Sequence, residues 1–98
     1  MKDQYAYFFK CFSHNSKNTI LYLLAQNKEM TVEELADNME IDSSTISRHL
    51  NNLKMQDIVA MRVDSPSHYY SLKPEEIKNK FADFLSYLNI KDKTTSLF

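Results

Sequence analysis

The sequence predicts a mainly α-helical fold with one small β-hairpin, on two observations. Residues before 57 divide into four helix-like stretches, and residues 74–90 form a fifth with an apolar stripe. Between them, residues 58–63 and 68–72 are rich in strand-forming side chains and flank a turn that contains Pro66.

The first two predicted helices differ in composition. Residues 3–12 form a short aromatic helix, which the stretch at 14–16 ends. Residues 16–27 form a strongly apolar helix, and Asn27 is its expected left-handed end because asparagine tolerates a positive φ.

Two further helices follow, joined by a tight connection at residues 40–41. Thr31 and Glu34 have the spacing of a capping box, so the third helix should begin there. Asp42 is the expected N-cap of the fourth helix. One side of that helix carries three apolar residues at i, i+4 and i+7 spacing: Ile46, Leu50 and Leu53.

The order of these elements predicts a particular architecture. Two helices joined by a short turn form a helix-turn-helix. A hairpin directly after the second helix makes the unit a winged helix-turn-helix, and Pro74 suits the first turn of the last helix. We expect one winged-helix domain over residues 1–90 and a flexible tail over residues 91–98.

Composition excludes several classes of protein. The chain has no glycine, so it lacks the glycine-rich loops that cradle nucleotide phosphates. Its one cysteine cannot form an internal disulfide framework, and no apolar run is long enough to span a bilayer. No serine–histidine–carboxylate set is suggested. We therefore expect a non-enzymatic cytoplasmic protein with no cofactor and no membrane partner.

The charge pattern changes sign at the start of the fourth predicted helix. The formal net charge of −1 does not by itself indicate a nucleic-acid binder. Residues 29–42 hold six acidic side chains and no basic one, whereas residues 43–56 hold Arg48 and Lys54 and no acid. Chance clustering on a mixed surface is the alternative explanation.

The fourth helix has a polar side that suits the major groove of DNA. A helical wheel places four side chains opposite the apolar ones: Ser44, Ser47, Arg48 and Asn51. Thr45 and Lys54 flank this arc, whereas His49 lies close to the apolar side. Arg48 can donate two hydrogen bonds to guanine, and Asn51 can pair with adenine. An ordinary solvated helix face is the competing interpretation.

The run TVEELADNMEIDSSTISRHLNNLKMQDIV, followed by HYYSL, resembles the ArsR/SmtB family of winged-helix repressors. The preceding FSHNSKNTILYLL resembles the start of that family's second helix, so the likeness covers about residues 8–73. The resemblance implies a homodimeric transcriptional regulator with the fourth helix in the major groove. It also implies base- and phosphate-contacting residues by position in the motif: Ser43, Ser44, Ser47 and Arg48 in the helix, with Arg62, Ser67 and His68 in the wing.

The chain departs from the family pattern at several positions. Asn15 and Lys17 replace the usual proline and arginine, and Lys17 is expected to contact phosphate with less specificity than an arginine. Glu40 and Asp57 stand where glycines are usual. The hairpin also lacks the usual arginines and glycines, which suggests a short wing with weak backbone contact.

The sequence does not predict a metal-sensing site. Many members of the family sense metals through a Cys-x-Cys in the third helix or through Asp and His in the last helix. The third helix here has no cysteine or histidine, and the last has no histidine. Cys11 and His14 alone are too few for a four-coordinate site, so no metal is expected, although gating of repression through Cys11 remains an alternative.

Aromatic residues are concentrated in the two terminal helices, which hold eight of the twelve. Because aromatic side chains surround the first helix, we expect both terminal helices to form a two-fold dimer interface rather than only their own core. The predicted interface residues are Tyr5, Phe8, Phe9, Phe12, Phe81, Phe84, Leu85 and Leu88.

These observations favour a homodimeric, sequence-specific regulator of transcription, expected to be a repressor, whose partners are double-stranded DNA and a second copy of itself. Its recognition helix would span about residues 43–55. The alternative is a winged-helix module for protein–protein assembly with no role on DNA. The sequence does not identify an effector.

Overall fold

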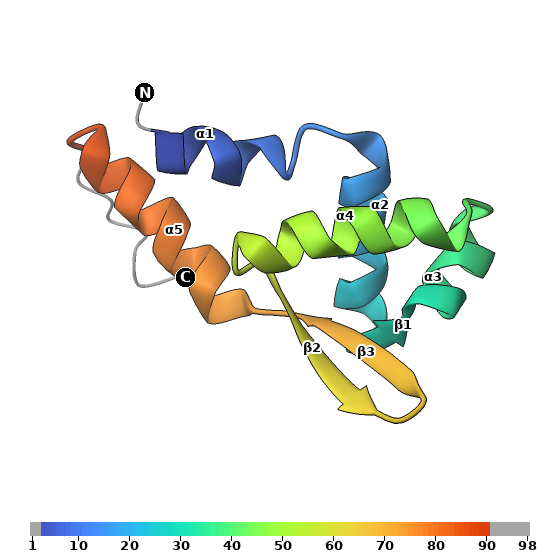
Figure 1. The fold of residues 1–98 in the computed structure, drawn as a ribbon. Helices are drawn as coiled ribbons and strands as arrows, with labels where there is room; N and C mark the ends of the chain where they lie inside the picture. Colours follow the sequence, from blue (N-terminus) through green and yellow to red (C-terminus); the bar gives the residue numbers. More distant parts are fainter. Residues whose placement is uncertain (1–2, 91–98) are drawn as a thin grey trace.

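The computed structural model describes residues 3–90, which form five helices and a three-stranded antiparallel sheet (Figure 1). The predicted tail at residues 91–98 lies outside the described residues. In chain order the elements are α1 (Asp3–Lys10), α2 (Asn15–Asn27), β1 (Glu29–Thr31), α3 (Val32–Met39), α4 (Ser43–Met55), β2 (Val59–Asp64), β3 (Ser67–Leu72) and α5 (Pro74–Tyr87).

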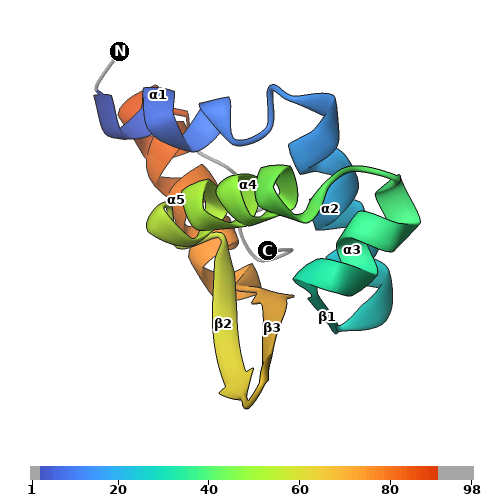
Figure 2. The same ribbon diagram turned by 45° about the vertical axis from the view of Figure 1, so that its right-hand side comes forward.

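The arrangement is a winged helix-turn-helix, as the order of elements predicted. Helices α3 and α4 contact each other across a short turn and form the helix-turn-helix. The β2–β3 hairpin projects away from the helices in both views and forms the wing (Figures 1 and 2). No helix in the described part of the chain has the length and apolar character needed to cross a membrane.

The sheet contains one strand that the sequence pattern did not predict. Its strand order is β1-β3-β2, with Met30 opposite Tyr70 in one pair and Arg62 opposite Tyr69 in the other. Strand β1 has only three residues, too few for a detectable alternation. It is a strand because it pairs with β3, which lies about forty residues later in the chain.

Local sequence signals set most helix starts. The Glu34 N–H donates to Thr31 Oγ1 at 3.1 Å, and the Thr31 N–H donates to Glu34 Oε1 at 2.8 Å, which confirms the predicted capping box. Asp42 caps α4, and Pro74 is in the first turn of α5. Helix α5 ends at Tyr87, three residues before the predicted end.

Within residues 3–90, four residues have a positive φ: Lys28, Glu40, Asp57 and Asn89. The prediction that Asn27 is the left-handed end of the second helix was wrong. Asn27 remains helical and donates a side-chain hydrogen bond to the Leu23 carbonyl, and Lys28 takes the positive φ instead. Glu40 and Asp57 occupy the positions where the family pattern has glycine, so each bears a backbone cost of about 1–2 kcal/mol.

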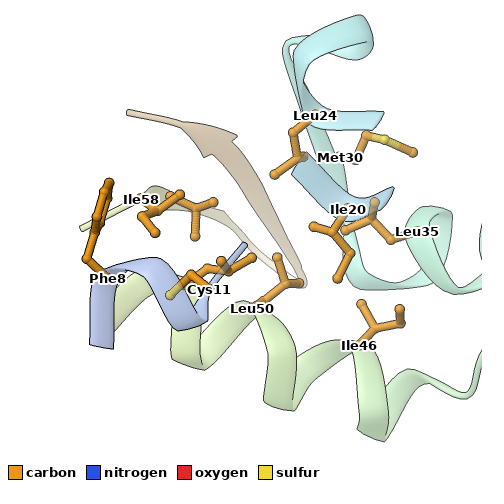
Figure 3. Packing of buried hydrophobic residues seen from close by; sticks show 11 residues of the cluster. Phe8, Cys11, Ile20, Leu24, Met30, Leu35, Ile46, Leu50 and Ile58 are labelled. Carbon is orange, nitrogen blue, oxygen red and sulfur yellow. The ribbon is translucent and has the colours of Figure 1, made fainter. Parts of the chain in front are cut away.

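The core fixes α4 to the rest of the domain. Ile46, Leu50 and Leu53 are fully buried, as the helical spacing predicted. Figure 3 shows Ile46 and Leu50 pointing from α4 toward Ile20 of α2. Burial of each such side chain contributes about 1.5–3 kcal/mol, so α4 is held firmly on one side while its other side faces solvent.

Helices α1 and α5, from opposite ends of the chain, lie on the same side of the molecule (Figure 1). They contact each other through their aromatic rings. The rings of Phe8 and Phe81 are 5.1 Å apart between centroids, and those of Phe9 and Phe84 are 4.6 Å apart, both in edge-on geometry. The Tyr5 hydroxyl also donates to the Asp83 carbonyl at 3.4 Å. The two terminal helices therefore form one layer beside the helix-turn-helix.

Candidate nucleic-acid interface

The outer side of α4 is polar and exposed. The four side chains that the helical wheel placed outward are all exposed: Ser44, Ser47, Arg48 and Asn51. Ser43 and Lys54 are exposed as well, and Thr45 is half-buried at the edge. The helix contains no acidic residue, so a polyanion can approach this side without repulsion from α4 itself.

Two of the hydroxyl groups at the start of α4 are occupied by the helix cap. Thr45 Oγ1 donates to Asp42 Oδ1 at 2.8 Å, and the Thr45 N–H donates to Asp42 Oδ2 at 3.1 Å. Ser44 Oγ donates to the same carboxylate. These hydrogen bonds, those from Ser44 first, lower the pKa of the Asp42 carboxyl to about 2.

This capping network separates the hydroxyls of α4 into two kinds. Ser44 and Thr45 already donate their protons to Asp42, so toward a ligand they offer only acceptor lone pairs. Within residues 3–90, Ser43 and Ser47 make no hydrogen bond through their hydroxyls, and Arg48 makes no ion pair. The side chains able to donate to phosphates or bases are therefore Ser43, Ser47 and Arg48, with Asn51 and Lys54 nearer the end of the helix.

His49 lies on the inner flank of α4. Its ring is half-buried, and its pKa is lowered chiefly by that burial, with further lowering from the charges of Lys17, His14 and Arg48. Both causes favour the neutral form of the ring. This placement agrees with the wheel, which put His49 close to the apolar side.

The wing arginine is held by an acid from β1. Arg62 donates to both carboxylate oxygens of Glu29, at 2.7 and 3.3 Å, and its guanidinium stacks on the Tyr69 ring at 4.6 Å. The hydrogen bond from Arg62 lowers the pKa of the Glu29 carboxyl, and the same bond raises the pKa of Arg62. Asp64 adds a second carboxylate 3.9 Å from the guanidinium.

The other predicted wing residues lie at the tip of the hairpin. Ser67 begins β3 directly after the two-residue turn and is half-buried, and His68 next to it is exposed. Because the wing's arginine is neutralised by Glu29 and Asp64, the hairpin offers less free positive charge than its sequence suggests. Sequence spacing could not identify Glu29 as a partner, since it lies 33 residues from Arg62.

Lys17 is separated from the exposed side of α4. Only 7% of it is exposed, and it lines a cavity of about 370 Å³ between α1, the start of α2 and the end of α4. A contact between Lys17 and a DNA phosphate would require its side chain to extend outward from this position.

The predicted interface residues of the terminal helices fall into two groups according to their burial. Tyr5 and Phe8 are buried within the single chain, where Phe8 is only 1% exposed, so they have little ring surface left for a second chain. The remaining predicted rings and Leu85 are half-buried, and Leu88 is 48% exposed. Three further apolar residues in this region are exposed but were not among the predicted interface residues: Tyr7, Tyr87 and Ile90.

Cys11 is a buried thiol rather than an open ligand. Its Sγ donates to the Tyr7 carbonyl at 3.5 Å, and burial raises its pKa, partly offset by the charges of Lys17 and Lys80. Among the residues that the structure describes, no cluster of three or more His, Cys, Asp or Glu side chains could hold a metal ion.

Comparison with known proteins gives a consistent result. The family described as "Bacterial regulatory protein, arsR family" matches residues 15–60. An uncharacterized HTH-type transcriptional regulator of Methanocaldococcus jannaschii is 34% identical over 76 residues, which cover 78% of this chain and 85% of that protein. The transcriptional repressor SdpR of Bacillus subtilis is 30% identical over 84 residues, which cover 86% of this chain and 92% of the repressor.

A solved structure shares the same architecture. The homodimeric winged helix-turn-helix DNA-binding domain of a possible regulator from Mycobacterium bovis superposes with a TM-score of 0.70 at 27% sequence identity. The match covers 87% of this chain and 79% of that domain.

Proposed function

The chain belongs to the ArsR family of bacterial regulatory proteins, which are transcriptional regulators and not enzymes, and we propose that it represses transcription as a homodimer. In this proposal α4 enters the major groove of double-stranded DNA in the cytoplasm. The observation that carries it is the acid-free polar side of α4, which is exposed while Ile46, Leu50 and Leu53 anchor the opposite side.

The exposed side chains of α4 suggest a division of roles. Arg48 and Asn51 have the donor geometry for direct contact with base edges, and both are exposed. Ser43, Ser47 and Lys54 suit phosphate contacts, which fix the orientation of the helix on the duplex. The Asp42 network holds the first turn of α4 rigid, so Ser44 and Thr45 support this arrangement more than they read bases.

Dimerisation would compensate for the low net charge. A two-fold axis near α1 and α5 would place Arg48 and Lys54 of both chains on one side of the dimer. Four exposed apolar residues at those helices support this interface: Tyr7, Tyr87, Leu88 and Ile90. Three half-buried apolar residues lie on the same two helices: Phe9, Phe84 and Leu85. The homodimeric Mycobacterium bovis domain supports the same assembly by analogy.

Selection of bound sequences from a random duplex pool tests the proposal. We expect enrichment of a pseudo-palindrome whose half-sites lie about one helical turn apart. Arg48→Ala should weaken binding to the selected site by about tenfold or more and relax base preference at one position of each half-site. Lys28→Ala serves as the control. Lys28 is exposed at the C-terminal end of α2, so this variant should bind like the native chain.

The alternative is a winged helix used only for protein–protein assembly. The ion pair that neutralises Arg62 and the net charge of −1 favour this reading. Absence of binding to any duplex at low salt would support it and contradict the repressor proposal.

A further inference from the structure

A cavity beside the recognition helix has the properties of an anion-binding site. It has a volume of about 370 Å³, at the small end of the range for organic ligands. Residues from α1, from the start of α2 and from the end of α4 line it. It is distinct from the exposed polar side of α4 that the repressor proposal uses.

The lining of the cavity is basic. It includes Lys10, His14 and Lys17, and no carboxylate is among its lining residues within the described part of the chain. Lys17 is the central group because it is only 7% exposed. Within residues 3–90 its ammonium forms no hydrogen bond and no ion pair. A buried ammonium without a partner is costly, so an anion in the cavity would supply the missing interaction.

The start of α2 adds a second, independent feature. His14 is the N-cap of this 13-residue helix, yet its side chain makes no capping hydrogen bond. The first backbone N–H groups of the helix therefore have no capping acceptor, and they carry the positive end of the helix dipole. His14 and Lys17 both line the cavity, so this helix end adjoins it.

The remaining lining residues define the rest of the ligand. Tyr7 and Met55, both mostly exposed, provide apolar and aromatic surface at the cavity. Asn52 provides an amide that can donate or accept a hydrogen bond. This combination fits a molecule with a small apolar body and one anionic head.

We propose that the cavity binds a small organic anion with a carboxylate or phosphate head. The head would pair with the Lys17 ammonium and the first N–H groups of α2, and the apolar body would lie against Tyr7 and Met55. A free molecule fits better than a phosphate of the DNA backbone, because Lys17 is recessed and a duplex is too wide to follow it. The inference does not depend on DNA binding by α4.

Titration of the full chain, followed by amide chemical shifts in NMR, tests the proposal. The probes are benzoate and phenyl phosphate at constant ionic strength, with benzamide as the neutral analogue of benzoate. We expect saturable shifts at residues 14–17 and 52–56 with at least one anion and none with benzamide. Equal shifts with benzamide, or unsaturable shifts spread over the surface lysines, would overturn the proposal.

A charge-removing variant makes the test specific. Lys17→Met keeps an unbranched side chain only one atom shorter, removes the charge and should weaken binding of the anion by about tenfold or more. Lys28→Met removes one exposed charge from the other end of α2 and should leave binding unchanged. If Lys17→Met does not fold, Lys10→Met at an exposed residue of the same cavity should still weaken binding measurably.

A random duplex distinguishes the two sources of a phosphate group. If the duplex shifts residues 14–17 while neither organic anion does, the cavity is a DNA-backbone contact and the proposal is wrong. If the organic anions change the amide chemical shifts of these residues with or without the duplex, the ligand is a free molecule. This conclusion holds whether or not α4 binds DNA.

Discussion

At the scale of single residues, the protein has residues with a Cβ at positions where a positive φ would favour glycine. Glu40, in the turn between α3 and α4, has φ 54° and ψ 43°, and its N–H still donates to the Ala36 carbonyl. A residue with a Cβ is disfavoured in this left-handed conformation, and glycine is not.

Glu40→Gly is therefore expected to stabilise the fold by about 0.5–1 kcal/mol, after the greater flexibility of the unfolded chain is subtracted. Urea unfolding followed by circular dichroism measures the difference. Asp37→Gly, at an exposed position inside α3, should instead destabilise the protein by about 0.5–1 kcal/mol. A loss of stability in both variants would contradict the assigned conformation of Glu40.

Asp42 gives a second prediction at this scale, on the dependence of stability on pH. Its pKa falls from an ordinary 3.8 to about 2 in the folded chain, mainly through the hydrogen bond from Ser44 and then those from Thr45. Because the folded state favours the ionised carboxyl, its stabilising effect is complete above pH 3.8 and is lost as the pH falls toward about 2.

Asp42→Asn removes this titration and keeps a side chain that can cap a helix. The native chain should be more stable than the variant at pH 7, and the difference should shrink as the pH falls through 3.8 toward 2. Other carboxyl groups titrate in both proteins and cancel in the comparison. A difference in unfolding free energy that stays constant over this range would show that Asp42 is not held as the structure indicates.

At the scale of elements, the wing is fixed to β1 by an ion pair rather than left free for DNA. Arg62 of β2 reaches across β3 to Glu29 of β1, and the two strands have no direct pairing. An arginine held in this way contributes little to the attraction of a polyanion.

Glu29→Gln should release Arg62 for phosphate contact. We expect the affinity for a random duplex at low salt to rise by up to about fivefold, with a salt slope steeper by up to about one unit per chain. Glu33→Gln removes the same charge from the exposed start of α3, where it has no contact with Arg62. If both variants change binding equally, net charge and not the release of Arg62 is the cause.

At the scale of the whole molecule, the terminal helices serve both the single chain and the proposed dimer. The rings of Tyr5 and Phe8 complete the layer between α1 and α5, while Leu88 and its exposed neighbours remain available for a second chain.

Leu88→Lys is expected to shift the proposed dimer toward monomer, because it would introduce a charge into the proposed apolar interface. Sedimentation velocity at several protein concentrations measures the shift. Tyr22→Lys, at an exposed tyrosine of α2, is the matched control and should sediment like the native chain. Unchanged sedimentation of Leu88→Lys would contradict an interface at the end of α5.

The features that the sequence predicted correctly are those whose causes are local. Thr31 and Glu34 meet within one helical turn, and Asp42 caps the helix that follows it, so spacing alone was sufficient. The features that it missed depend on contacts distant in sequence. Strand β1 exists only through its pairing with β3, and the burial of Phe8 depends on Phe81 of α5.

The candidate site shows the same limit. The orientation of α4 followed from its own apolar spacing, and the exposed side chains agree with it. The partner of Arg62 and the recessed position of Lys17 did not follow, because each is set by residues from other elements. A helical wheel describes one helix and contains no information on what covers its flanks.

The two positive-φ residues that flank α4 also bear on how the domain can move. Glu40 precedes the helix and Asp57 follows it, and a Cβ confines each to a narrow conformational well that glycine would widen. Neither joint can act as a loose hinge. A force applied at one end of α4 is therefore expected to move the helix as a unit rather than to bend the chain at Glu40 or Asp57.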